Sequence, residues 1–378
     1  MSDGELIDRL RLIRTENVGP VTFFTLLRRF GSASRALQAL PDLARRGGRA
    51  NAPAIPTRAD AERELAAAKK IGARVVAFDE PHYPEALKAI GDAPPLFYLS
   101  GNADLLSRRA VAVVGARNAS AAGVRFARQL AAELAGTGML VVSGLARGID
   151  GAAHLGALDA GDAAGGTLAV LAGGVDQVYP PEHAALYEKI AASAVGAVLS
   201  ERPPGLVARE RDFPKRNRLI AGLSLGVIVV EAAFRSGSLI TARLANEQGR
   251  EVFAVPGSPL DPRCRGANDL IRQGATLTES AGDVLAVLGA AARTAPVPVR
   301  GAQAVESERE SFAAPDESAL AQARDRVLGA LGPTPVEVDE IVRQCQLSAP
   351  VVQAALLELE LAGRLARHSG NRVALDAS

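Results

Sequence analysis

The sequence predicts an α/β protein whose main domain is a doubly wound, mostly parallel sheet, with a helical domain before it and a small module after it. Between residues 73 and 289, short apolar runs alternate with helical segments, as expected for a parallel sheet covered by helices on both faces. Before this region, the apolar residues follow a helical period. After it, a stretch mixing Pro, Ala and charge precedes a second compact region.

Length and composition limit the possible classes of protein. With 378 residues, 48% of them hydrophobic, the chain can fill two or three folded cores. The cysteines, Cys264 and Cys345, lie far apart, and we identify neither a signal peptide nor an apolar run long enough to span a bilayer. We therefore expect a cytoplasmic protein without membrane insertion. The net charge is +1, so binding a polyanion would require a local basic patch.

Residues 1–72 are expected to form the helical domain. Two amphipathic segments meet at Val18-Gly19-Pro20, where Gly and Pro end one helix and start the next. The pattern resembles a helix-hairpin-helix or sterile-alpha-motif unit, in which hairpin N–H groups can contact a phosphate. Helices joined by Gly-Pro also occur in many bundles without such contacts, so both interpretations stay open.

The main domain is predicted from six apolar runs, most of which end in Gly, Ser or a charged residue. The runs begin at Ala110, Met139, Thr167, Ala197, Leu225 and Glu251. They predict an extended Rossmann-like domain over residues 73–289. In such a domain the loops after the strands gather on one rim, where an open α/β sheet binds its ligand.

The first of these loops, residues 115–120, does not fit a dinucleotide site. Arg117 occupies the place where GxGxxG needs a second glycine, and the chain contains no GxxxxGK[ST] phosphate loop. Arg117 instead offers a planar fork for a phosphate, with Asn118 and Ser120 as neutral donors beside Gly115. The alternative is a surface arginine without a partner.

The second loop follows the strand that ends at Ser143-Gly144. It places Arg147 between glycines and Asp150 at an expected helix start, with His154 one turn further on. Metal binding by Asp150 and His154 is one interpretation. We favour capping and packing, because the sequence has no second Asp or His cluster nearby.

The stretch from residue 212 to 245 contains the strongest anion-binding signal. Lys215, Arg216 and Arg218 are expected to open a helix, where free N–H groups and the helix dipole favour an anion. After the strand at residues 225–230, Glu231 and a Ser-Gly-Ser turn would lie at the edge of the sheet. The alternative for the basic residues is a solvated helix start.

The C-terminal region is expected to comprise a flexible linker, residues 290–320, and a winged-helix-like domain, residues 321–378. The helix that would read DNA, over residues 348–362, carries Glu358 and Glu360 but no Lys or Arg. Acidic groups there would repel phosphates. We therefore favour a protein-contact or autoregulatory module over a DNA reader, although both stay open.

Several motifs occur together in one order between Phe78 and Leu277: VAVVGARNAS, VVSGLARGIDGAAH, LAVLAGGVDQVYP, FPKRNRLIAGLS, SGSLITARLANEQGREVFAVPG and GANDLIRQGA. The chain thereby resembles the DNA-processing protein A (DprA/Smf) family. The resemblance implies a single-stranded DNA-binding protein of natural transformation and recombination that protects incoming DNA, helps load the RecA recombinase and forms a homodimer.

The resemblance also implies the residues of a DNA site, without catalytic residues, metal or cofactor. Arg117 and Lys215 would line a DNA pocket. Its expected neighbours are Gly115, Ser143, Gly144, Arg147, Gly174, Arg216, Asn217, Arg218, Ser236, Gly237 and Ser238. Asn118 and Ser120, the neutral donors of the first loop, are expected to belong to the same site. The alternative is an enzyme, a Rossmann-like nucleotide phosphoribohydrolase with Glu231 as its acid–base group.

Overall fold

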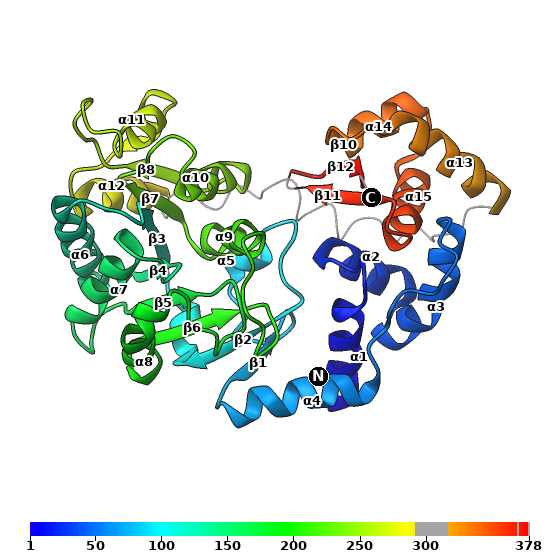
Figure 1. The fold of residues 1–378 in the computed structure, drawn as a ribbon, viewed down its shortest axis with the longest axis horizontal. Coiled ribbons are helices and arrows are strands. Elements are labelled where there is room, and N and C mark those ends of the chain that lie inside the picture. Colours follow the sequence, from blue (N-terminus) through cyan, green and yellow to red (C-terminus); the bar gives the residue numbers. More distant parts are fainter. Residues whose placement is uncertain (292–316, 369, 377–378) are drawn as a thin grey trace. The chain divides into compact units, whose positions relative to one another are not determined.

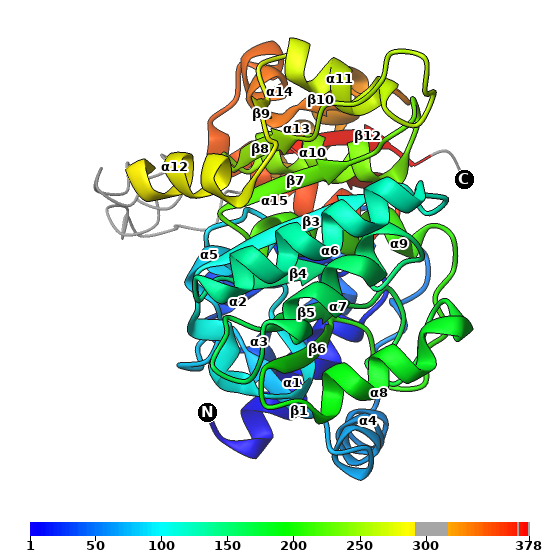
Figure 2. The ribbon, with the colours of Figure 1, turned by 90° about the vertical axis from the view of Figure 1, so that its left-hand side faces the viewer.

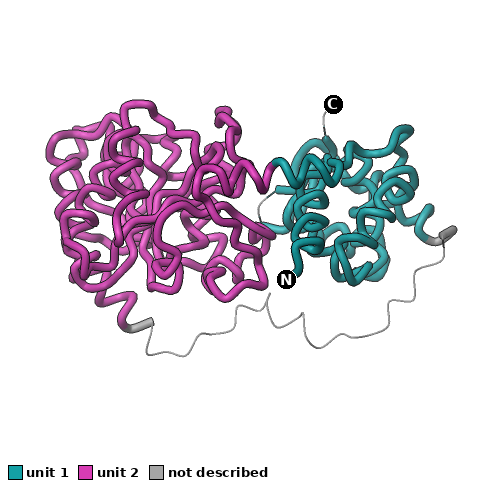
Figure 3. The backbone as a smooth tube through the Cα atoms, turned by 90° about the horizontal axis from the view of Figure 1, so that it is seen from below, with its two compact units in different colours: residues 1–63, 304–378 teal, residues 64–303 magenta. Residues whose placement is uncertain are grey.

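Figure 1 shows the computed structural model, which describes residues 1–291, 317–368 and 370–376. The chain divides into two compact units (Figure 3). Residues 64–303 form the sheet unit, and residues 1–63 and 304–378 together form the terminal unit. Most of the predicted linker, residues 292–316, lies outside the described residues.

The described part of the sheet unit is built on a nine-stranded sheet in the order β1-β2-β6-β5-β4-β3-β7-β8-β9. The strands from β6 to β9 in this order are parallel, and β2 and β1 extend the β6 edge in antiparallel fashion. The predicted mostly parallel sheet is therefore confirmed. The strands are β1 (Arg74–Ala77), β2 (Leu96–Gly101), β3 (Ala110–Gly115), β4 (Leu140–Ser143), β5 (Thr167–Val170), β6 (Gly196–Ser200), β7 (Gly226–Val230), β8 (Glu251–Ala254) and β9 (Thr276–Leu277).

Helices cover both faces of this sheet because each face is apolar along the central strands. Figure 2 looks onto the face that carries α6 (Ala121–Gly136), α7 (Ile149–Asp159) and α12 (Ala281–Ala291). The opposite face is covered by α5 (Glu85–Lys88), α9 (Asp212–Leu223), α10 (Gly237–Glu247) and α11 (Arg265–Arg272). α8 (Ala184–Ala192) packs beside α7 over β5 and β6. The strand order reverses between β3 and β7, which is where ligands bind in such sheets.

The terminal unit combines a helical bundle with a winged helix. The bundle contains α1 (Asp3–Arg14), α2 (Pro20–Phe30) and α3 (Ala33–Arg46); α4 (Arg58–Lys70) contains the boundary with the sheet unit. The winged helix contains α13 (Glu317–Ala330), α14 (Val338–Cys345), α15 (Ala349–Leu361), β10 (Val336–Glu337), β11 (Leu365–His368) and β12 (Arg372–Leu375). The winged-helix prediction is confirmed, and its wing is a three-stranded sheet in which β12 pairs with both β10 and β11.

Candidate nucleic-acid interface

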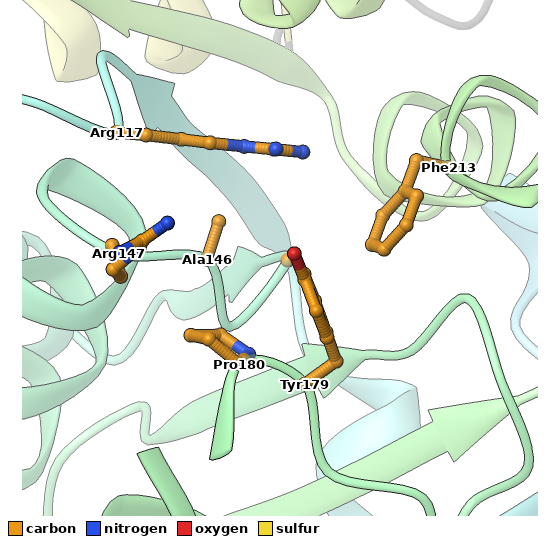
Figure 4. Close-up of a pocket in the computed structure, with 7 residues that line it drawn as sticks. Arg117, Ala146, Arg147, Tyr179, Pro180 and Phe213 are labelled. Carbon is orange, nitrogen blue, oxygen red and sulfur yellow. The ribbon is translucent and has the colours of Figure 1, made fainter. Parts of the chain in front are cut away.

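A pocket lies where the loops after β3, β4 and β5 meet the start of α9 (Figure 4). Parallel strands bring these loops to one edge of the sheet, although they are far apart in the sequence. The pocket is lined by Arg117, Gly144, Ala146, Arg147, Tyr179, Pro180 and Phe213. Its walls therefore combine two arginines with two aromatic rings.

Two of the residues that line the pocket, Arg117 and Phe213, contact each other. The Arg117 Cζ atom lies 5.5 Å from the centroid of the Phe213 ring, which is cation–π distance. The Tyr179 ring lies 5.2 Å from Phe213 at an interplanar angle of 57°. In Figure 4 the Arg117 side chain reaches across the pocket toward Phe213. Lys215, two residues after Phe213, is exposed in the first turn of α9 and is not among the residues that line the pocket.

The predicted basic cluster of α9 is not wholly on the surface. Lys215 is exposed, but Arg216 and Arg218 are only 6% and 8% exposed. Two of the three cations expected at the DNA site are therefore enclosed by the protein. Consecutive residues of a helix point about 100° apart, so Arg216 turns into the protein while Lys215 faces solvent.

Arg216 is used inside the protein. Its Nη1 donates to the carbonyl oxygens of Gly144, at 2.8 Å, and Val170. A Cβ atom at Gly144 would lie 2.5 Å from that Nη1, so the glycine leaves room for the guanidinium. Burial lowers the pKa of Arg216 to about 10, while the neighbouring Asp150 carboxylate raises it.

Arg218 is also bound by protein acceptors, on the side of α9 that faces the β2 end of the sheet. It pairs with Glu201 and with Asp92, whose Oδ2 lies 3.6 Å from Nε. Burial works against the charge of Arg218, yet the two carboxylates raise its pKa overall. Both arginines hold the start of α9 in place, and Lys215 remains the exposed cation of the predicted trio.

The β4–α7 loop is held from below by Asp150, which is buried in the first turn of α7. Asp150 Oδ2 accepts hydrogen bonds from the backbone N–H groups of Gly144, at 3.1 Å, and Ala146, at 3.4 Å. Ser143 is fully buried, and its hydroxyl donates to the Val113 carbonyl at 2.6 Å. Arg147 is exposed above this framework and lies 3.9 Å from Glu182.

Glu231 occupies the start of α6, where a Rossmann protein would bind an anionic ligand. Its carboxylate accepts from the Ser120 backbone N–H at 2.8 Å and from the Ser120 hydroxyl. A Cβ atom at Gly123 would lie 2.7 Å from the Glu231 carboxyl carbon, so this glycine gives the carboxylate its space. Ser120 therefore serves as the N-cap of α6 and as a partner of Glu231, and this helix start already holds an anion of the protein itself.

The other predicted site residues lie outside the residues that line the pocket. Asn118 is exposed in the β3 loop, and Gly115 packs against β7 so closely that a Cβ atom would lie 1.9 Å from the Val230 carbonyl oxygen. Gly174 is buried, and a Cβ atom at this position would lie 2.5 Å from the Pro203 carbonyl oxygen.

The Ser-Gly-Ser turn forms the start of α10. Ser236 is the N-cap, and its hydroxyl accepts from the Ser238 N–H at 3.4 Å. Asn217 donates to the Gly237 carbonyl at 3.4 Å, which joins the turn to α9. These residues connect the two helices and do not line the pocket.

The metal interpretation of Asp150 and His154 finds no support among the described residues, which contain no group of three or more potential ligands. Asp150 caps the loop above it, and His154 Nδ1 is hydrogen-bonded to the Thr167 hydroxyl at 2.7 Å. Nor does any helix in the described ranges have the length and apolar character of a membrane span.

The pocket residues that were not predicted as site residues are Ala146, Tyr179, Pro180 and Phe213. The loop after β5 did carry a signal, because it contains Tyr179 and starts at the same edge as Arg117. What could not be read from the chain was that Tyr179 meets Phe213, which is 34 positions away in the sequence.

The fold and pocket define a Rossmann-like protein with a pocket, lined by arginines and aromatic rings, at the carboxyl edge of its sheet. Residues 74–289 match the family described as DNA recombination-mediator protein A. Residues 3–67 match a DprA-like N-terminal HHH domain, and residues 312–371 match a DprA winged helix domain. The chain belongs to the DNA recombination-mediator protein A family, also called DprA or Smf.

Individual relatives agree with this assignment. Protein Smf of Escherichia coli is 39% identical over 297 residues, which cover 79% of this chain and 76% of the relative. The crystal structure of DNA processing protein A from Streptococcus pneumoniae has 38% identity and a TM-score of 0.61, covering 74% of this chain and 96% of that one. DNA processing protein A from Helicobacter pylori, described for its single-stranded DNA binding mode, has 28% identity and a TM-score of 0.51, covering 58% and 97%.

Proposed function

We propose that this chain binds single-stranded DNA in the pocket at the ends of β3, β4 and β5. The observation that carries the proposal is the contact of Arg117 with Phe213, 5.5 Å from Cζ to the ring centroid. It joins the cationic loop after β3 to the first turn of α9, which carries Lys215. Membership in a family whose Helicobacter pylori relative is described for single-stranded DNA binding supports the same conclusion.

The phosphates would be bound by the exposed cations. Arg117 supplies a planar fork that can donate two hydrogen bonds to one phosphate, and Lys215 supplies a mobile point charge. Arg147, 55% exposed, is the second arginine that lines the pocket beside Arg117. Because these contacts address the sugar-phosphate backbone, binding should depend on salt and tolerate changes of sequence.

The bases would be bound by the two rings. Tyr179 is 47% exposed and Phe213 is half-buried, so each ring can present a face to a base. Stacking on aromatic rings contributes about 1 to 3 kcal/mol per base in single-strand binding proteins. Bases within a duplex are already stacked on one another, so the rings favour an unpaired strand.

The cellular role follows from the family as a further part of this proposal. We propose that the chain acts in the cytoplasm during natural transformation and recombination, protects incoming strands, helps load RecA and works as a homodimer. We also propose that it is not an enzyme. The rim carboxylate that a phosphoribohydrolase would use, Glu231, is bound by the Ser120 N–H and hydroxyl groups.

Fluorescence anisotropy with an oligothymidine and with a duplex of the same length tests the proposal. We expect tighter binding to the single strand, and weaker binding by Arg117→Ala and Lys215→Ala with unchanged circular dichroism. Arg243→Ala is the matched control, because Arg243 is an exposed arginine on α10 outside the pocket. Equal affinity of all four proteins would remove the pocket from the site. Release of free base from nucleoside monophosphates would instead favour the enzyme.

A further inference from the structure

The C-terminal half of helix α15 is buried on all sides in the terminal unit. Every residue from Ala355 to Leu361 is buried, including two glutamates. Val352, Ala355, Leu356 and Leu359 contribute to the core of the winged helix itself. A helix of a free winged helix would expose its other side to solvent or DNA, so the burial of that side requires a second partner.

The second partner is the N-terminal bundle. Leu357 and Leu361 belong to the same apolar cluster as residues of α1, α2 and α3, such as Phe23 and Leu40. Gly47, which ends α3, lies against the backbone of α15. A Cβ atom at Gly47 would lie 2.0 Å from the Glu358 carbonyl oxygen, so only glycine permits this approach.

Charge complementarity explains the glutamate at the centre of the contact. Glu358 is fully buried; its Oε2 pairs with Arg324 of α13 at 2.5 Å, and its Oε1 lies 4.0 Å from Arg46 of α3. Arg29 of α2 also interacts electrostatically with Glu358. Burial lowers the pKa of Arg29, and the Glu358 carboxylate acts in the opposite direction. Arginines of both modules therefore offset part of the desolvation cost of burying this carboxylate in the contact.

The predicted phosphate-binding hairpin lies in the same contact. Asn17, in the turn between α1 and α2, donates to the carbonyl oxygen of Leu361 at 3.5 Å. A Cβ atom at Gly363 would lie 3.0 Å from the Asn17 side chain. The backbone N–H groups of Glu16 and Val18 in this hairpin donate hydrogen bonds to the carbonyl oxygens of Ala54 and Thr15, respectively. These two N–H groups are therefore already used within the protein.

We propose that the N-terminal bundle and the winged helix recognise each other, so that α15 is an intramolecular docking helix instead of a DNA-reading helix. The partner of its outer face is the bundle of the same chain. Asn17 of the hairpin and the C-terminal half of α15, which belong to the two elements that the sequence offered as separate nucleic-acid surfaces, both take part in the contact. This inference concerns the terminal unit only and is independent of the function proposed for the pocket.

Cleavage between the two modules tests the proposal. A site for a sequence-specific protease is inserted within residues 292–316, and the folded full-length protein is cut and analysed by size-exclusion chromatography. We expect the C-terminal fragment of the otherwise unchanged protein to co-elute with the rest of the chain. In Gly47→Ala the fragment should elute separately, because the added methyl overlaps the Glu358 carbonyl.

The control is Gly4→Ala, since Gly4 lies in α1 with open space around it. Gly47 has φ −68°, so alanine fits its backbone and the variant should disturb the contact and not the helix. Leu361→Asp, at the end of α15 and outside the winged-helix core, should release the fragment from the other side. Separation of the fragment without any substitution, or co-elution in both variants, would overturn the proposal.

Discussion

Asp150 and Arg216 hold the same residue, Gly144, by its two backbone groups. Asp150 Oδ2 accepts from the Gly144 N–H at 3.1 Å, and Arg216 Nη1 donates to the Gly144 carbonyl oxygen at 2.8 Å. Both side chains are buried, and Gly144 lines the pocket. The floor of the pocket is therefore positioned by an opposite-charge pair that does not itself reach the surface.

Replacing Arg216 should lower the free energy of unfolding more than replacing any exposed cation of the site. Arg216→Ala leaves Asp150 buried without its cation, a change that costs about 3 to 5 kcal/mol in buried pairs. Burial already raises the pKa of Asp150, and loss of Arg216 would raise it further. Urea denaturation followed by circular dichroism measures the loss.

Lys215→Ala is the control for this experiment, because Lys215 is the adjacent exposed residue. Its free energy of unfolding should stay within about 0.5 kcal/mol of the unsubstituted protein. Equal free energies of unfolding of the two variants would contradict the structural role of Arg216.

Replacing Tyr179 should weaken binding to a single strand without changing its salt dependence. Tyr179→Ala removes one stacking face, which corresponds to about 1 to 3 kcal/mol per base. Tyr179→Phe keeps the ring and should bind like the unsubstituted protein. Anisotropy titrations with oligothymidine at several salt concentrations separate the two effects. A reduced salt slope in Tyr179→Ala would show that the residue acts on the phosphates instead.

Removing the carboxylate of Glu231 should destabilise the start of α6. Glu231→Ala deletes two charge-assisted hydrogen bonds to Ser120, and we expect a loss of about 1 to 3 kcal/mol. Ser120→Ala removes the hydroxyl contact and keeps the backbone N–H contact, so the two substitutions share one hydrogen bond and the double variant should lose less than the sum of the single losses. Thermal denaturation of the three variants gives the coupling. Fully additive losses would contradict the contact.

His154 should make the protein less stable as the pH falls. The Thr167 hydroxyl donates to the Val141 carbonyl at 2.9 Å, so His154 Nδ1 is the donor to Thr167 and its buried Nε2 has no hydrogen-bond partner. Burial lowers the pKa of His154 to about 3, with His183 and Arg216 acting in the same direction.

The sign follows from proton uptake. Below pH about 6.5 the unfolded chain protonates His154 and the folded chain does not, so stability falls by about 1.4 kcal/mol per pH unit toward the folded pKa. In His154→Asn, the part of the stability loss that comes from protonation of His154 should be absent between about pH 6 and pH 4. Denaturation curves across that range test the difference, and parallel pH profiles of the two proteins would refute it.

Periodicity and composition were sufficient for the architecture. The apolar runs of β3 to β8 stand out because central parallel strands are buried on both faces. Short edge strands such as β9 and β10, with two residues each, carry no such pattern and were not predicted.

The site was predictable only in part, because a run of charges does not say which side chains face solvent. Arg216 precedes Leu219 and Ile220 by three and four residues, the spacing that puts side chains on one helix face, so its burial could have been inferred. The meeting of Tyr179 with Phe213 depends on the order of strands in the sheet, which local sequence does not specify.

The salt dependence of single-strand binding tests the central claim most directly. The claim is that Arg117 and Lys215 neutralise phosphates on one rim of the sheet. For a single strand each neutralised phosphate contributes about 0.7 to the slope of log affinity against log salt. The double variant Arg117→Ala/Lys215→Ala should therefore lose about 1.4 from that slope together with affinity. Arg243→Ala should keep both, whereas a double variant with the slope and affinity of the unsubstituted protein would contradict the account.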